Sequence, residues 1–163
     1  KGSSYIWLMI LIFIFIGMTV ILLDNSSIYM NTKKIKSGLS LSVKAAALAI
    51  NENEQLAEGI FTINPVQAER NFKQILSENI GLNEITLEPL STGSLVTEKP
   101  EIREFVVEDN TPATYYSAAL ENSFTFENPS VLAVIRVKVK GVFSSRIITL
   151  YKLSSSQLTS VYD

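Results

Sequence analysis

The stretch YIWLMILIFIFIGMTVILL, residues 5–23, decides the fold of this chain. These 19 residues, from Tyr5 to Leu23, carry no charge, and only Gly17 and Thr19 are not large and apolar. As an α-helix they would extend about 28 Å, close to the ~30 Å hydrocarbon thickness of a bilayer. The segment is apolar on every side, unlike a helix that covers a soluble core. We call it the apolar run, and it predicts a helix that lies in a membrane or inside an assembly.

The apolar run differs from the hydrophobic region of a cleaved secretory signal. Such regions span ~7–15 residues and precede a cleavage site of small residues. Here the polar sequence DNSS follows Leu23, without such a site. We therefore expect the run to stay on the mature chain, either as a plain signal anchor or as a helix that packs against copies of itself.

Basic residues on both sides of the run bear on its orientation. The chain begins at Lys1, and Lys33, Lys34, Lys36 and Lys44 follow the run. Since lysines favour the cytoplasmic side of a membrane, these four oppose an external head. A basic leader that a peptidase removes just before Lys1 would resolve this conflict. We expect such processing, and a trimmed sequence is the alternative.

A helical pattern continues beyond the apolar run. Apolar residues recur at intervals of seven and four, as on one helix face: Ile28, Ile35, Leu39, Ala46, Ile50 and Ala57. No proline occurs before Pro65, and Gly59 suits a C-terminal stop. We therefore predict one helix from about residue 4 to about residue 58. Its first half is apolar all round and its second half is amphipathic.

Residues 59–163 are predicted to form a small head domain beside the helical unit 1–58. Asn64, Pro65 and Gln67 form an N-terminal capping pattern for a short second helix, and Gly81 ends it. One face of this helix is predicted to be apolar: Ala68, Phe72, Ile75, Leu76 and Ile80. The head therefore contains at least one short helix.

The rest of the head is predicted to be an antiparallel sheet. Ile135, Val137 and Val139 alternate with basic residues, which indicates a half-buried strand. Residues 146–153 are predicted to pair with it as a hairpin across residues 141–145. Further strands are predicted at 84–88, at 102–108, and at either 115–118 or 123–126. Residues 89–100 should form an exposed loop and the tail 154–163 should be peripheral. The fold class is α+β.

The composition argues against several kinds of activity. The chain contains no Cys and no His, so it lacks disulfides, thiolate chemistry, the commonest general base and the commonest metal ligand. Residues 1–58 carry five lysines against four acids, and residues 59–163 carry nine basic against twelve acidic residues. Neither part has the basic surface that nucleic-acid binding requires. Glu52, Glu54 and Glu58 do not share one helix face. We expect no enzyme, no cofactor and no metal site.

The N-terminal third combines several features in one order. Gly2 and a small residue precede the apolar run, Asp24 ends it, Tyr29 follows, and residues 45–49 read AAALA. In this combination residues 2–49 resemble the N-terminal module of the TadE/TadG-like proteins, in the tight-adherence branch of the type IV pilin superfamily. The resemblance implies a pilin-like fold, membrane insertion, processing by a prepilin-type peptidase, and a role as a pilus subunit or in pilus assembly.

The candidate functional residues lie in and beside the apolar run. We expect these to take part in the membrane helix or filament core: Tyr5, Trp7, Phe13, Phe15, Gly17 and Leu23. Classical type IV pilins carry a glutamate where this chain has Tyr5. In this chain the only acid near the run is Asp24. We hypothesise that Asp24 pairs with Lys1 of an adjacent subunit, because a carboxylate in an apolar zone is costly unless paired. Alternatively, Asp24 simply marks the membrane–water boundary.

The sequence leads to one expected function and two alternatives. We expect a structural subunit of an extracellular pilus-like filament, a homopolymer that resides in the inner (cytoplasmic) membrane before assembly. Its partners would be copies of itself and, by resemblance, a prepilin-type peptidase and the pilus assembly machinery. The alternatives are a minor TadE/TadG-like membrane-anchored assembly protein and a signal-anchored extracytoplasmic binding or adhesin module.

Overall fold

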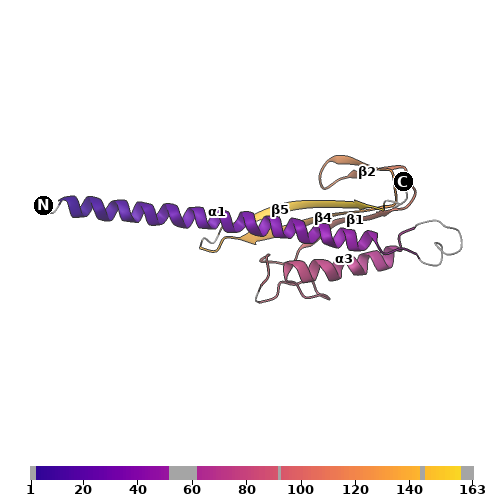
Figure 1. Ribbon diagram of the computed structural model, residues 1–163, viewed down its shortest axis with the longest axis horizontal. Coiled ribbons are helices and arrows are strands. Elements are labelled where there is room, and N and C mark those ends of the chain that lie inside the picture. The colour runs from indigo at the N-terminus through magenta and orange to yellow at the C-terminus, as the bar shows by residue number, and fades with distance from the viewer. Residues whose placement is uncertain (1–2, 52–61, 92, 144–145, 159–163) are drawn as a thin grey trace.

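The computed structural model consists of one long helix with a small α+β head on its C-terminal half (Figure 1). The structure describes residues 3–51, 62–91, 93–143 and 146–158. Helix α1, Ser3–Ala47, is 45 residues long. Its N-terminal half projects away from the head, whereas its C-terminal half lies along it. The α+β class and the long N-terminal helix are as predicted.

Helix α1 ends earlier than the sequence predicted. Its last residue is Ala47, and the chain then makes an antiparallel β-bridge between Ile50 and Ile63. The prediction of a helix that continues to about residue 58 is therefore wrong. Strong helix formers follow Ala47, but the tertiary pairing of Ile50 overrides their propensity. The remaining residues of the predicted helix, with Gly59, lie outside the described residues.

The C-terminal half of α1 packs through the predicted apolar face. Four of the predicted positions are buried: Ile28, Ile35, Leu39 and Ala46. Gly38 lies where α1 approaches the second helix, since a Cβ there would be 3.0 Å from Asn79 Cβ. The amphipathic half of α1 therefore belongs to the core of the head.

Helix α3, Pro65–Ile80, has its predicted start and stop. Asn64 Oδ1 accepts hydrogen bonds from two backbone N–H groups of the first turn, both at 3.1 Å. Gly81 ends the helix in the left-handed conformation with φ 76°. The Gln67 side chain donates to Asn71 Oδ1 at 2.8 Å. The predicted apolar face is buried at Ala68, Phe72, Leu76 and Ile80, and half-buried at Ile75.

The main sheet has three antiparallel strands in the order β1–β4–β5. The strands are β1 Glu101–Glu108, β4 Ser130–Lys140 and β5 Ile147–Gln157. The predicted alternating strand is the central strand β4, and its predicted hairpin partner is β5. The hairpin prediction is confirmed, and so is the predicted strand 102–108.

Strand β5 is longer than predicted and includes part of the supposed tail. Its register with β4 runs from Lys140↔Ile147 to Ser130↔Gln157. The hydroxyl of Ser154 lies 3.1 Å from the hydroxyl of Ser40 on α1. The serines at 154–156 are therefore part of the sheet, because β4 supplies a partner along their whole length.

A second, two-stranded sheet covers part of the main sheet. Strands β2 Ala113–Ser117 and β3 Asn122–Phe126 pair antiparallel with each other. The two segments that the sequence offered as alternatives are thus both strands. Phe126 packs with Leu132 and Val134 of β4. Because neighbouring strand residues point to opposite faces, this hairpin covers the face of the sheet turned away from α1 (Figure 1).

The predicted strand 84–88 is a turn. Asn83 Oδ1 accepts hydrogen bonds from the backbone N of Ile85 at 2.9 Å and of Thr86 at 3.0 Å. Such local bonds from an asparagine side chain compete with strand pairing. The prediction of a strand here is wrong. Leu87 is buried but Ile85 is 92% exposed, so the two apolar residues do not share a buried face.

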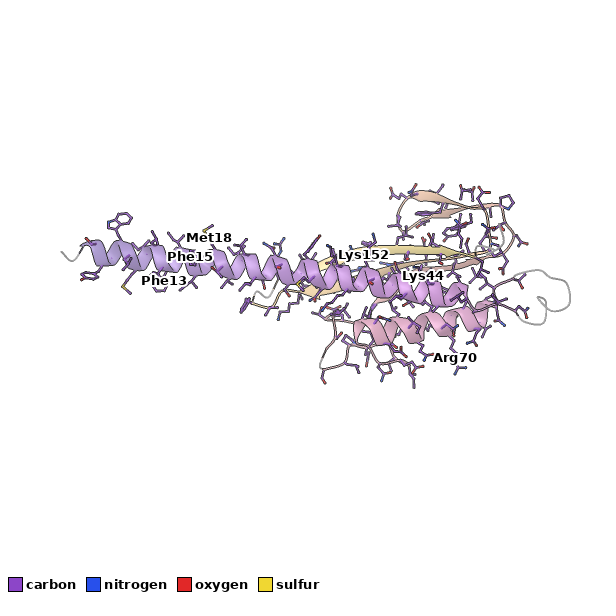
Figure 2. All side chains as sticks on the ribbon, viewed as in Figure 1. Phe13, Phe15, Met18, Lys44, Arg70 and Lys152 are labelled. Carbon is purple, nitrogen blue, oxygen red and sulfur yellow. The ribbon has the colours of Figure 1, made fainter. Side chains whose placement is uncertain are left out.

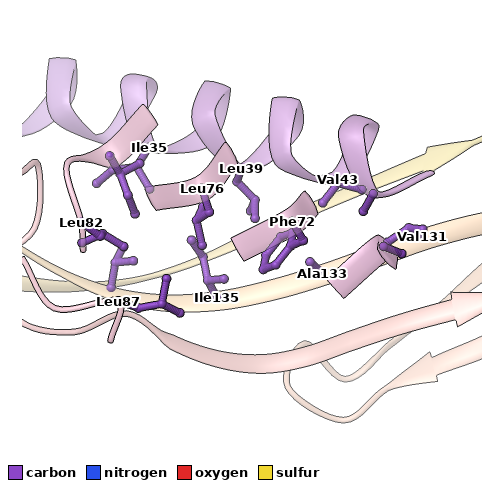
Figure 3. Packing of buried hydrophobic residues seen from close by; sticks show 14 of the residues in the cluster. Ile35, Leu39, Val43, Phe72, Leu76, Leu82, Leu87, Val131, Ala133 and Ile135 are labelled. Carbon is purple, nitrogen blue, oxygen red and sulfur yellow. The ribbon is translucent and has the colours of Figure 1, made fainter. Parts of the chain in front are cut away.

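The core of the head lies between α1, α3 and one face of the main sheet (Figure 3). Phe72 is fully buried there, and its ring centroid lies 5.0 Å from that of Phe105 on β1. Ile35, Leu39 and Val43 of α1 pack in the same cluster. The head therefore holds the C-terminal half of α1 in a fixed position.

Candidate functional site

The apolar run is exposed along its whole length. The exposed fractions of its large side chains range from 44% at Ile10 to 71% at Tyr5, apart from the half-buried Val20. Phe13, Phe15 and Met18 project from the helix with no part of the head near them (Figure 2). Among the described residues, α1 is the one helix long and apolar enough to cross a membrane.

The predicted filament-core or membrane residues all lie on this exposed half of α1. They are Tyr5, Trp7, Phe13, Phe15, Gly17 and Leu23. Since each residue turns the helix by about 100°, the aromatic members point in different directions. An added Cβ at Gly17 would meet nothing within 4 Å. The arrangement suits apolar surroundings on all sides rather than contact with a single partner helix.

Asp24 marks the point where the exposed half of α1 meets the head. It is only 6% exposed, although Leu23 beside it is half exposed. Its Oδ1 accepts a hydrogen bond from the backbone N of Phe143, in the β4–β5 turn, at 2.8 Å. A Cβ on Gly141 would lie 2.5–2.6 Å from the carboxyl atoms of Asp24. The turn therefore encloses this carboxylate.

The predicted ion pair between Lys1 and Asp24 of adjacent subunits stays a prediction. Lys1 lies outside the described residues. Asp24 has a hydrogen-bond donor within its own chain, which stabilises a buried carboxylate without a neighbouring subunit. Sequence reasoning missed the donor at Phe143. The one sequence signal near it was Gly141, at the end of a predicted strand.

We expect Gly141→Ala to destabilise the head through Asp24. The added Cβ would displace the carboxylate from the Phe143 N–H, and losing a charge-assisted hydrogen bond costs about 1–3 kcal/mol. In an Asp24→Ala background the same substitution should have little effect, because the clash is gone. Urea unfolding of the four full-length proteins in detergent would measure this coupling. Additive effects of the two substitutions would contradict it.

An open groove lies between α3 and the main sheet. Its volume is about 640 Å³, and its walls include Lys73, Leu87 and Ile102. Two of the cations in it are paired: Arg136 lies 3.0 Å from Glu101, and Lys138 lies 2.8 Å from Glu98. Because both of these cations already have an acidic partner, we assign no ligand to this groove.

Glu104 and Tyr115 form a polar contact between β1 and the β2–β3 hairpin. The backbone N of Ala119 donates to Glu104 Oε1 at 2.8 Å. Burial raises the pKa of Tyr115, and the charge of the nearby Glu104 raises that pKa further. Tyr115 is therefore a neutral phenol at neutral pH, which suits packing rather than nucleophilic chemistry.

The acidic residues of the described chain do not form a metal site. Within residues 3–51, 62–91, 93–143 and 146–158, no three acidic side chains come together in a way that would hold a metal ion. Glu52, Glu54 and Glu58 lie outside these ranges. The expectations of no metal and no catalytic residue therefore remain predictions.

Comparison with known proteins gives no relative. No protein-family model matches the chain, and no curated protein or solved structure matches it either. The resemblance of residues 2–49 to the TadE/TadG-like proteins therefore stays a prediction. The structure establishes a long apolar N-terminal helix, long enough to span a membrane, that continues without a break into an α+β head.

Proposed function

We propose that this protein is a structural subunit of an extracellular pilus-like filament, in which the apolar runs of many copies pack together. Before assembly the same run would hold each copy in the cytoplasmic membrane. The observation that carries the proposal is the exposure of the run on all sides of a helix whose other half is rigidly packed in a folded head.

The hydrophobic effect requires that the run be covered. Fully burying one large apolar side chain contributes about 1.5–3 kcal/mol, and the run has 17 apolar residues. A bilayer supplies one cover, since residues of this kind insert favourably. Once the chain leaves the bilayer, a comparably apolar cover is needed, and the runs of identical copies supply it.

The rigid joint between run and head favours a polymer over a tethered binding module. Helix α1 passes from the run into the head without a break, and Ile35, Leu39 and Val43 fix it there. Copies that pack through their runs would therefore hold their heads in equivalent orientations, as a helical polymer requires. A module that only needs to reach a ligand is better served by a flexible linker.

Shearing cells that make this protein is the direct test. We expect fibres in the supernatant that antibodies against the head label along their length. Cells that lack the gene are the control. Trace labelling of fibres made of another protein would instead indicate a minor subunit. Exclusive recovery of single copies from the membrane fraction would contradict the proposal.

A further inference from the structure

We propose that Val142 and Phe143, which follow β4, form a second membrane contact in the headgroup region of the bilayer that holds the apolar run. The surface consists of these two side chains with Lys140 and Arg146 on either side, and its partner is an anionic lipid surface. The inference rests on the membrane-inserted state in the proposed function, but not on the filament.

The hydrogen bond to Asp24 sets the depth of the turn. Asp24 is the first charged residue after the run, so it lies where a helix spanning the hydrocarbon region reaches the headgroups. The 2.8 Å bond from Phe143 N to Asp24 Oδ1 holds the turn at that same level. Figure 1 shows this end of the β4–β5 hairpin beside α1, at the side of the head nearest the exposed half of the helix.

The composition of the turn fits that depth. Val142 is 66% exposed and Phe143 is 60% exposed. Turns between strands usually carry Gly, Asn, Asp or Ser, so two exposed apolar residues there call for a partner. Lys140 and Arg146, whose side chains are also exposed, precede and follow them. Apolar or aromatic residues flanked by basic ones are typical of segments at a membrane interface.

A lipid surface fits this turn better than the apolar run of a second copy. The basic residues on either side match anionic headgroups, and they would be poorly solvated against an apolar helix. Long basic side chains can also extend to headgroups while their stems cover apolar surface. Every inserted chain carries its turn at the depth of its own Asp24, so the lipid contact needs no neighbour.

Single cysteines can test this, because the chain has none of its own. Phe143→Cys keeps the backbone N–H that bonds Asp24. Leu22→Cys in the run and Val66→Cys, 80% exposed on α3, are matched controls within and away from the membrane. Each full-length protein would carry an environment-sensitive fluorophore and be reconstituted at a low protein-to-lipid ratio. The vesicles would contain phosphatidylcholine and phosphatidylglycerol, with a spin-labelled lipid whose quencher lies near the headgroups.

We expect the labels at residues 143 and 22 to lose most of their fluorescence to the lipid-borne quencher, and the label at residue 66 to keep it. Quenching at residue 143 should weaken in vesicles of phosphatidylcholine alone. A Phe143→Trp chain in a Trp7→Phe background, with brominated lipids as quenchers, should give the same result without an attached fluorophore.

Several results would overturn the inference. One is a label at residue 143 that behaves like the one at residue 66. Another is a blue-shifted label at residue 143 that the lipid-borne quencher does not reach, since protein would then cover the turn. Equal quenching at residue 143 with and without phosphatidylglycerol would contradict an anionic lipid surface as the partner. No quenching at residue 22 would refute membrane insertion, and with it the inference. Quenching at residues 22 and 143 without fibres on shearing would refute only the filament.

Discussion

Replacing Phe13 by arginine should weaken the membrane partition of this protein about a hundredfold and abolish the proposed fibres. Phe13 lies near the middle of the apolar run and is 67% exposed, so the substitution leaves the core of the head intact. On insertion scales an arginine at a helix centre costs about 2.5–3.5 kcal/mol, whereas phenylalanine is slightly favourable. A difference of about 3 kcal/mol corresponds to roughly a hundredfold change in partition.

The measurement for Phe13→Arg is the share of protein that stays in carbonate-washed membranes, together with the fibre yield after shearing. Phe13→Leu is the matched control, because it changes size and shape without adding a charge, and it should behave like the wild type. Circular dichroism in detergent should show the same secondary structure for all three proteins. Normal membrane retention and normal fibres with Phe13→Arg would rule out a role for the run in either environment.

Replacing Phe72 by alanine should cost the head a large part of its stability. Phe72 is fully buried between α1 and the sheet, with its ring 5.0 Å from that of Phe105. Truncating a buried phenylalanine costs about 3–5 kcal/mol, because apolar contact is lost and a cavity remains. Whole domains are stable by only about 5–15 kcal/mol. The substitution should therefore lower the urea midpoint strongly.

Urea unfolding of the full-length protein in detergent, followed by circular dichroism, measures the effect of Phe72→Ala. Val66→Ala is the matched control on the same helix, since Val66 is 80% exposed and its truncation should change the free energy of unfolding by no more than about 0.5 kcal/mol. The hydrophobic core assigned to the head would be in error if the two variants unfolded at the same urea concentration.

Elements with local signals could be predicted from the sequence. Helix α3 begins at an asparagine cap followed by proline and ends at Gly81, and each of these acts through the backbone of its own turn. Strand β4 could be recognised from residues 135–140, where buried residues alternate with less buried ones because only one face of the strand is covered there. The apolar run required only its composition and length.

Elements that depend on distant partners could not be predicted. The end of α1 depends on the bridge between Ile50 and Ile63, and strand β5 continues through its serines because β4 lies beside them. The segment 84–88 alternates like a strand, but Asn83 bonds its backbone locally and turns it. The pairing of Ile50 with Ile63 and of β5 with β4 joins separate parts of the chain, which the periodicity of one segment does not reveal. In segment 84–88 the deciding bonds are local, but they come from one side chain and not from the apolar–polar pattern.

The amino-acid sequence by itself determined that this chain has an apolar segment of membrane-spanning length. The hydrophobic effect is non-directional, so it depends on the amount of apolar area and not on particular partners. Only the tertiary structure decided which group donates a hydrogen bond to the carboxylate of Asp24, at the end of that segment. Its hydrogen-bond donor, Phe143, lies 119 residues further along the chain. The donor is a backbone N–H, which every residue except proline carries, so only folding of the β4–β5 hairpin against α1 selects it.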